Sequence, residues 1–459
     1  MLHRRLSLLQ AVSLNMGMMV GVGPFITIPV FIQSMGGPQA MIGWVLGALV
    51  AMADGLVWSE LAAAFPGSGG TYHFYDAIFG RSTLGRTLKF LFVWQFLFSG
   101  PLELASGAIG LGNYAGFLWE PLKATAWTIP LGAKAAWTVR WGQVMAALAM
   151  LGVVALAYRR IEVAGKLMVL LWAGMLATVA FVIVAGLTRF DAAQAFDFPA
   201  DAWRLDGKFA FGLGAALGVA MYDFLGYYQV CYLGDEVADP ARTIPRAILI
   251  SALAVSAIYL TMNVSILGVV PWRDAMTSEH IASDFMGLRF GPGAATLVTV
   301  LILWTGAASI FAGILSYSRI PYAAARSGHF FSALAATHPR GEFPHRSLIV
   351  VGVLSAVACL LGLDVVIPAL LTSRILIQFV GQVGALSYVR ARPELRSRLL
   401  FRMPLFPLPA LFALVGWLYV FGTTSLITIA FALLTMALGL LAFFVWDRGR
   451  IEEKTSISG

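Results

Sequence analysis

The chain has 459 residues, of which 59% are hydrophobic and 12% are charged, and its formal net charge is +8 at pH 7. A water-soluble domain of this composition would expose large apolar patches and aggregate, which excludes a soluble enzyme or a soluble nucleic-acid-binding domain. Apolar stretches of about 20 residues, the length that crosses a bilayer core, fill nearly the whole chain instead. The composition therefore predicts one membrane domain over residues 1–459.

Twelve apolar segments in succession predict an all-α membrane protein with twelve transmembrane helices. Their boundaries are residues 9–34, 40–64, 88–118, 137–157, 165–187, 209–234, 244–270, 292–318, 347–362, 365–389, 405–421 and 424–446. The connections between them leave no room for a soluble domain. The polar residues 448–459 are predicted to form a cytoplasmic tail.

Most of the Lys and Arg residues lie in every second loop between these segments. Because cytoplasmic loops carry an excess of Lys and Arg, this placement predicts a multi-pass protein of the cell membrane with both termini in the cytoplasm. The positive charge therefore sets orientation, with membrane lipid as a partner, and does not indicate nucleic acid. The first segment is too long for a cleavable signal peptide, and we interpret it as the first span.

The first apolar segment is interrupted in its middle by the run Gly21-Val22-Gly23-Pro24-Phe25. Two glycines and a proline weaken a helix at mid-membrane depth, where unwound backbone survives only if it is buried in protein or lines a watery cavity. Close helix packing also uses glycine, but it does not need the additional interruption by a proline. We therefore predict a broken helix that contributes to a binding site.

A second interruption is predicted in the sixth segment, over residues 218–227, and it contains the acid Asp223. Two interrupted helices at corresponding places in two halves of a chain are typical of the binding site of a secondary transporter. The two breaks predict inverted five-helix repeats over residues 1–190 and 205–395. Two further helices follow in residues 403–447.

Five short motifs, taken in order, resemble the amino acid–polyamine–organocation permeases over the chain to about residue 446. They are Gly21-Val22-Gly23-Pro24-Phe25; Ser59-Glu60-Leu61 with Phe65-Pro66-Gly67-Ser68-Gly69-Gly70; Asp235-Glu236-Val237-Ala238-Asp239-Pro240 with Ile244-Pro245-Arg246-Ala247; Ser318-Arg319 with Ser327-Gly328; and Arg392-Pro393-Glu394-Leu395 with Arg402-Met403-Pro404. The resemblance implies the LeuT-type inverted-repeat fold and the transport of amino acids or polyamines. It places the substrate between the first, third, sixth and eighth helices.

The resemblance also assigns roles to the two breaks. The backbone of Gly21, Val22 and Gly23 would bind a substrate carboxylate, and the carbonyl groups of residues 18–20 and 221–226 would bind an ammonium group. A helix end with free N–H groups favours an anion, and one with free carbonyl groups favours a cation.

Aromatic residues in the second break match the gate of the resembled family. Tyr222 corresponds to its gating aromatic and Tyr227 to a nearby one, and an aromatic face can hold an ammonium group by cation–π attraction. Phe25, Met221 and Gly226 complete the predicted substrate-binding set.

The chain departs from the resembled pattern where a carboxylate would bind. Val22 replaces a usual hydroxyl, and Pro24 removes an amide N–H, and both changes weaken a carboxylate cradle. The sequence Gly-Pro-Phe, together with Asp54 and Glu103, resembles the polyamine-transporting branch of this family more closely.

Three acids, Asp54, Glu103 and Asp223, lie inside predicted spans. Each costs about 2.5–3.5 kcal/mol at a helix centre, so each is expected to face a cavity or a partner. A cationic substrate would offset this cost. The alternative is an internal hydrogen-bond network or a carboxyl group kept protonated by desolvation. We interpret Asp223 as a substrate or proton contact and Asp54 as structural; both interpretations stay open for Glu103.

Coupling to H⁺ or Na⁺ has several candidate groups. The acids could carry a proton, and Thr305 and Ser309 lie where sodium-coupled proteins of this fold place hydroxyl ligands, although such hydroxyls commonly bond their own helix. The run Leu167 to Leu187 contains no Lys or Arg, which argues against coupling through a lysine of the fifth span. The sequence shows no metal-ligand cluster, catalytic pair or cofactor motif.

These observations predict a secondary active transporter that moves amino acids or polyamines by alternating access, with a preference for a cationic amine. A neutral amino acid carrier or exchanger is the alternative within this class. A channel is the alternative from another class, but it would need a continuous polar pore, whereas these acids are few and lie on separate segments. The expected partner is a small-molecule substrate, and the oligomeric state is left open.

Overall fold

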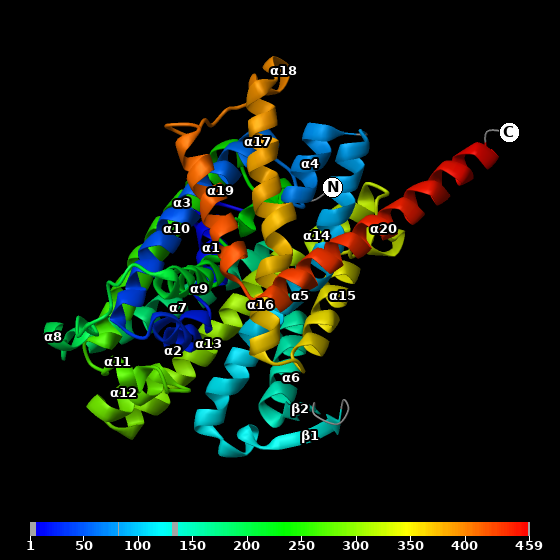
Figure 1. Ribbon diagram of the computed structural model, residues 1–459. Helices are drawn as coiled ribbons and strands as arrows, with labels where there is room; N and C mark the ends of the chain where they lie inside the picture. The colour runs from blue at the N-terminus through cyan, green and yellow to red at the C-terminus, as the bar shows by residue number, and fades with distance from the viewer. Residues whose placement is uncertain (1–5, 81, 131–135, 458–459) are drawn as a thin grey trace.

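The computed structural model describes residues 6–80, 82–130 and 136–457, with side chains described as far as residue 445. The described chain is a bundle of helices with one small antiparallel hairpin (Figure 1). The hairpin, α11 and α12 lie at one end of the bundle, and α4, α17 and α18 lie at the other.

The first apolar segment forms two helices, α1 (Leu8–Met19) and α2 (Gly23–Met35), bent by 44° at the break between them. Ser7 caps α1 through its side chain, and Pro24 occupies the first turn of α2, where a missing N–H has no cost. The broken first helix predicted from the glycines and proline is therefore present.

Seven helical segments of the described chain are long and apolar enough to cross a membrane, and the bent pair makes an eighth. They contain α3 (Met41–Ala64), α5 (Thr83–Leu118), α7 (Ile161–Leu187), α10 (Pro240–Leu267), α13 (Pro292–Tyr317) with α14 (Arg319–Arg326), α16 (Leu363–Arg374) with α17 (Gly381–Ala391), and α20 (Leu426–Ile457). Shorter apolar helices are α6 (Trp141–Ala157), α15 (His345–Ala358) and α19 (Leu408–Thr423).

The sixth apolar segment is helical for longer than the sequence predicts. Helix α9 (Gly207–Phe224) is regular through Asp223, and irregular backbone begins at Leu225. Gly226 has φ of +120°, a conformation that L side chains rarely adopt, so the turn falls where a glycine permits it. The 3₁₀ turns η3 (Gln229–Tyr232) and η4 (Gly234–Glu236) follow. Asp223 therefore lies in the last turn of α9, at the edge of the break.

The tenth apolar segment contains a feature that the sequence did not predict. A π-helical stretch, η6 (Ile375–Val380), separates α16 from α17. Such stretches are rare and frequently occur at functional sites.

The fourth apolar segment begins with a strand rather than a helix. Strands β1 (Thr125–Pro130) and β2 (Ala136–Arg140) pair antiparallel, and α6 starts only at Trp141. The remaining short elements are η1 (Pro38–Ala40), α4 (Thr71–Phe79), η2 (Glu120–Lys123), α8 (Ala192–Ala195), α11 (Trp272–Ala275), α12 (Ile281–Phe290), η5 (Ser332–Ala335) and α18 (Pro393–Arg396).

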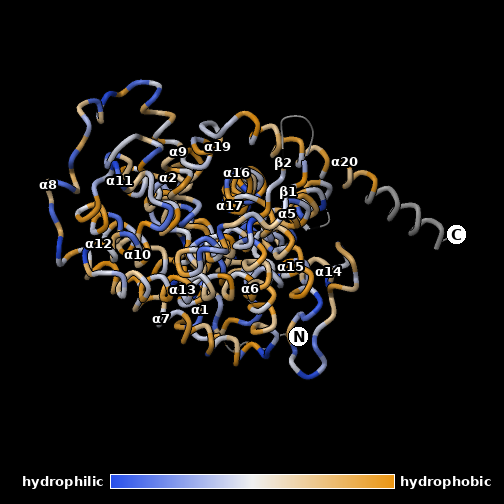
Figure 2. The backbone as a smooth tube through the Cα atoms, turned by 90° about the horizontal axis from the view of Figure 1, so that it is seen from below, coloured by the Kyte–Doolittle hydropathy of each residue, from blue (hydrophilic) through white to orange (hydrophobic). Residues whose placement is uncertain are grey.

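The helices carry apolar side chains on their outer faces as well as in the core. Leu170 and Val184 of α7 and Leu253 of α10 are each about 60% exposed, as expected of a surface that faces lipid rather than water. Figure 2 shows hydrophobic colour along the helices and hydrophilic colour mainly in the connecting loops. The chain is thus a multi-pass, mainly helical membrane protein.

Candidate functional site

A small cavity of about 30 Å³ lies at the break between α1 and α2. Its lining comes from both sides of that break and from α5, α9 and α13. The lining residues are Met18, Met19, Gly21, Val22, Gly23, Glu103, Ser106, Gly107, Tyr222, Asp223, Leu225 and Ser309. The two predicted breaks therefore meet at one cavity, together with the third and eighth apolar segments.

Glycines let the broken backbone approach its neighbours. A Cβ atom on Gly21 would lie 2.6 Å from Ser309 Oγ, and one on Gly23 would lie 2.5 Å from Asp223 Oδ1, which is too close in both cases. At the start of α2, Pro24 has no N–H group, and the N–H groups of Phe25 and Ile26 donate to the Val22 carbonyl oxygen at 3.0 and 3.2 Å. The N–H groups of Val22 and Gly23 are the donors left at this helix end. A helix N-terminus of this kind favours an anionic group of a ligand.

Asp223 presents an open carboxylate oxygen beside this helix end. Thr27 of α2 donates a hydrogen bond of 2.5 Å to Asp223 Oδ2, while the buried Oδ1 has no hydrogen-bond partner. The side chain is 3% exposed. An unpaired buried carboxylate oxygen is costly, so this atom is suited to bind an ammonium group or a proton.

Two tyrosines hold the ends of the broken helices in place. Tyr259 of α10 donates hydrogen bonds to the carbonyl oxygen of Met19 (2.6 Å) and to that of Asp223 (3.1 Å). Tyr222 donates to Ser106 Oγ of α5 at 2.8 Å, across the cavity. The carbonyl ends of α1 and α9 are thereby fixed side by side.

Glu103 lines the cavity but is already paired with a cation. Its Oε2 atom accepts hydrogen bonds from the Arg374 guanidinium of α16 and from the Tyr317 hydroxyl of α13. Arg374 is fully buried. The sequence analysis did not predict this pair. An arginine inside an apolar segment was the available signal, because such a charge needs a partner in the bundle.

Tyr227, Met221, Phe25, Pro24 and Gly226 are not among the residues that line the cavity. Tyr227 instead donates a hydrogen bond to Asp54 of α3, and Phe25 accepts one through its carbonyl group from Tyr114 at 3.2 Å. These five residues belong to the two breaks but lie behind the residues that line the cavity.

The two hydroxyls proposed for ion coupling make different contacts. Ser309 lines the cavity and donates to the carbonyl oxygen of Met18 at 3.3 Å, whereas Thr305 donates to Leu301 in its own helix at 2.9 Å. The side chain that α7 places between α1 and α13 in this region is Met168, which contacts Gly17 of α1. Lys166 is exposed instead of reaching this region.

A wide hollow of about 970 Å³ opens at the hairpin end of the bundle, between α2, α5, α6, β2, the start of α16 and the segment 276–280 that precedes α12. Val22, which lines the cavity, and Ile26, which lines this hollow, both pack against Gly110 of α5, where a Cβ atom would lie 3.1 Å from each. We name this hollow the vestibule.

An aromatic layer closes the cavity toward the opposite end. Trp58 of α3 stacks on Tyr228, with ring centroids 4.4 Å apart, and Phe96 of α5 contacts Tyr317 edge to face at 5.1 Å. All four rings are buried.

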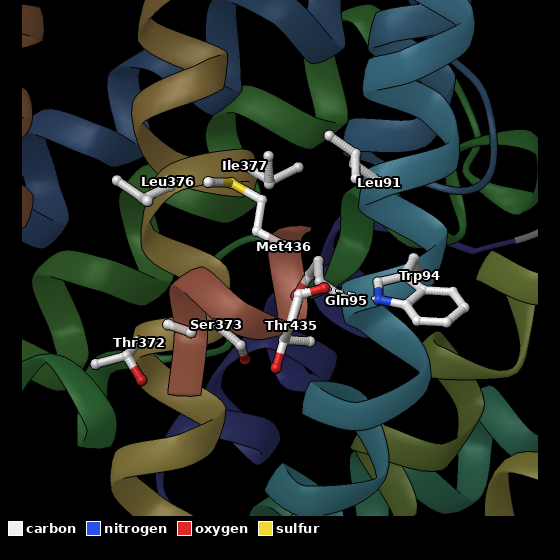
Figure 3. A pocket seen from close by; sticks show the side chains of 10 residues that line it. Leu91, Trp94, Gln95, Thr372, Ser373, Leu376, Ile377, Thr435 and Met436 are labelled. Carbon is white, nitrogen blue, oxygen red and sulfur yellow. Dashed lines mark hydrogen bonds between the residues drawn. The ribbon is translucent and has the colours of Figure 1, made fainter. Parts of the chain in front are cut away.

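A second small pocket lies between α5, α16, η6 and α20 (Figure 3). Its lining includes Leu91 and Trp94 of α5, Thr372 of α16, Ile377 of η6 and Met436 of α20. Its volume is about 10 Å³, and none of its lining residues is charged, so it offers no partner for an ionised group of a substrate.

Comparison with known proteins identifies the family. The sequence pattern of the family described as "Amino acid permease" matches residues 6–449. An uncharacterised transporter of Mycobacterium tuberculosis is 31% identical over 362 residues, covering 77% of this chain and 73% of the relative. The human cystine/glutamate transporter is 26% identical over 417 residues, covering 90% and 78%.

A serine/threonine exchanger of Bacillus subtilis is 25% identical over 450 residues, which cover 97% of this chain and 96% of the exchanger. Each family motif predicted from the sequence lies within the matched range. The chain belongs to the amino acid permease family of the amino acid–polyamine–organocation superfamily and is a multi-pass membrane transporter rather than an enzyme.

Proposed function

We propose that the chain is a secondary active transporter that carries an amino acid with one net positive charge by alternating access around the cavity at Gly21–Gly23. The observation that carries this proposal is the Asp223 carboxylate, whose Oδ1 atom is buried, lines the cavity and has no partner. A cationic side chain or amine of the substrate supplies the missing partner, and a charge-assisted hydrogen bond stabilises both groups.

The charge of the cavity wall favours a single positive charge over a polyamine. Glu103 and Asp223 are acidic, but Arg374 is paired with Glu103, so one negative charge is left for the substrate. A polyamine carries at least two positive charges and would leave one of them buried without a partner, which is unfavourable. Lysine or arginine fits this balance better.

The backbone at the first break supports an α-amino acid. The N–H groups of Val22 and Gly23 at the start of α2 are suited to an α-carboxylate, while the Pro24 nitrogen offers no donor and the Phe25 N–H is bonded to the Val22 carbonyl oxygen. Met18 and Met19, at the carbonyl end of α1, also line the cavity, but the Met19 carbonyl oxygen already accepts hydrogen bonds from Tyr259 and from the Gly21 N–H. Recognition of the backbone groups of the substrate therefore relies on fewer donors, and Asp223 adds the contact that selects charge.

The fold that we propose for this activity is the LeuT-type arrangement with twelve transmembrane helices. The bent pair, the seven long segments, α6, α15 and α19, and the eighteen-residue α9 supply these spans. Residues 1–190 and 205–395 form the inverted repeats, since each begins with a helix that breaks at the cavity. With both termini in the cytoplasm, the vestibule faces outward and the aromatic layer closes the inner side.

A neutral amino acid is the second candidate substrate, with Asp223 protonated. The similarity to a serine/threonine exchanger supports it. A channel is less well supported, because the cavity is small and an aromatic layer closes it toward one end of the bundle.

Counterflow in proteoliposomes tests the proposal. Vesicles loaded with unlabelled arginine, lysine, putrescine, spermidine, leucine or alanine are diluted into the matching labelled solute. We expect saturable uptake of arginine or lysine that depends on the internal solute, and none of spermidine. Uptake that does not saturate would indicate a channel, and uptake of leucine or alanine alone would indicate the neutral carrier.

A further inference from the structure

A second acid, Asp54, lies in the middle of α3 outside the cavity. It is fully buried, its Oδ2 atom accepts a hydrogen bond from the Tyr227 hydroxyl, and its Oδ1 atom has no hydrogen-bond partner. The indole rings of Trp58 and Trp417 lie beside the carboxyl group, although neither N–H makes a hydrogen bond of good geometry. The surroundings of Asp54 are therefore aromatic and nearly dry.

No cation of the described chain forms an ion pair with Asp54. Titratable or charged groups face α3 from the elements packed against it. Tyr227 contacts Asp54 itself, Tyr228 and Tyr232 contact Trp58, and Tyr259 contacts Trp44. Arg390 of α17 is paired with Glu60. Arg390 is therefore not available to Asp54, because its partner Glu60 lies about two helical turns further along α3. An ionised carboxylate without a counter-charge is strongly unfavourable in such a place, so the neutral form is favoured in this conformation.

The partners of Asp54 belong to elements that must rearrange during alternating access. Tyr227 directly follows Gly226, the positive-φ residue of the break after α9. Trp58 stacks on Tyr228 of the same break, and Trp417 stacks on Phe379 of the π-helical stretch η6 with ring centroids 3.8 Å apart. Opening the aromatic layer toward the cytoplasm moves Tyr227 and Tyr228, and it thereby removes the hydrogen bond to Asp54 and admits water.

We propose that Asp54 is a proton-binding site, separate from the substrate cavity, that couples transport to proton movement. In the conformation described here the carboxyl group holds one proton. When the segment 225–228 moves away, the O–H bond breaks and the proton passes to water on the cytoplasmic side. A proton taken up from water restores the acid before the layer closes again. This inference rests on the proposed transport activity, but not on the identity of the substrate.

Asp54→Asn tests the proposal because the amide has nearly the same shape and cannot carry a proton. Wild type and variant are compared in proteoliposomes for counterflow at equal pH and for accumulation driven by a pH gradient. We expect the variant to retain counterflow and substrate binding and to lose accumulation. Tyr227→Phe, which removes only the hydroxyl, should reduce accumulation less. Asp364→Asn, at an exposed acid of the vestibule, serves as the matched control and should accumulate normally.

Accumulation by Asp54→Asn at the wild-type level would overturn the proposal, and so would a wild type that exchanges substrate but ignores the pH gradient. Infrared difference spectroscopy gives a readout that does not depend on transport. A protonated carboxyl band should be present in wild type at neutral pH and absent from Asp54→Asn. If wild type transports no solute, the proposed function is wrong. The presence or absence of the protonated carboxyl band then tests by itself whether Asp54 binds a proton. If Asp54→Asn does not fold, absence of the band from wild type overturns the proposal.

Discussion

The Arg374 guanidinium is ion-paired with the Glu103 carboxylate at the wall of the cavity, and both side chains are almost completely buried. Two further nitrogen atoms of Arg374, Nε and Nη2, have no hydrogen-bond partner, and neither has Glu103 Oε1. The pair therefore neutralises one of the two acids that line the cavity without saturating either partner. This leaves Asp223 as the acid available to a substrate.

Removing one partner of this pair should destabilise the protein. Arg374→Met leaves a buried carboxylate without its counter-charge, which typically costs about 3–5 kcal/mol, whereas replacing both partners is often neutral. We expect a large drop in melting temperature for Arg374→Met and recovery in the double variant Glu103→Gln/Arg374→Met. Arg204→Ala, at an exposed pair with Asp206, is the control and should change little. An unchanged melting temperature for Arg374→Met would contradict the burial of the pair.

The close approach of Gly23 to Asp223 gives a test of the binding site. A methyl group at Gly23 would lie 2.5 Å from Asp223 Oδ1, so Gly23→Ala must displace the carboxylate oxygen that the substrate needs. We expect loss of substrate binding, measured by thermal shift with saturating ligand. Gly152→Ala in α6 is the matched control, since a Cβ atom there meets nothing within 4 Å. Equal ligand-induced shifts in the two variants would argue against a site at Gly23.

The turn after α9 should tolerate no side chain at Gly226. Its φ of +120° is unfavourable for other residues, and a Cβ atom would lie 2.7 Å from Met18 Cγ. Gly226→Ala is expected to destabilise by about 1–3 kcal/mol, with reduced transport, since the strain falls on the break itself. Gly384→Ala in α17 has open space around the new atom and should behave as wild type. Normal transport by Gly226→Ala would show that the backbone here adjusts freely.

His73 of α4, which lies outside the membrane-spanning segments, predicts a pH dependence of stability. Burial lowers the pKa of His73, against opposing attraction from Asp235 and Asp76. Below a pH of about 6.5, the reference value for histidine, the unfolded chain takes up this proton more readily than the folded protein, so stability is lost as the pH falls. His73→Gln should reduce the fall in melting temperature between neutral and mildly acidic pH. A steeper fall in the variant would mean that the folded state stabilises the protonated ring.

The first break could be predicted from sequence, because proline and glycine act locally on the backbone, whereas the convergence of the third, sixth and eighth apolar segments on it was implied by the family resemblance. The exact edge of the second break could not be predicted. Helix α9 continues through Asp223 because the chain turns only at Gly226, whose positive φ the turn requires. Hydropathy alone does not show whether the helix ends before Asp223 or at Gly226.

The pairing of side chains on different helices of the bundle also could not be predicted from the sequence. Glu103 and Arg374 are 271 positions apart, and a single sequence does not show which helix faces which. Tyr227 was assigned to the substrate because it matches an aromatic residue of the resembled family, yet its hydroxyl donates a hydrogen bond to Asp54 on α3. A change of helical direction at Leu225 sends the following aromatic side chains into a different layer.

The central claim is that Asp223 binds a positive charge of the substrate, and equilibrium binding to wild type and Asp223→Asn tests it most directly. Titration calorimetry with arginine, lysine, leucine and alanine should show tight binding of arginine or lysine to wild type. Truncating one partner of a buried charge pair costs about 2–5 kcal/mol or more, so the variant should bind the cation at least about 30-fold more weakly. If leucine or alanine binds wild type best and binds Asp223→Asn equally well, the claim is contradicted.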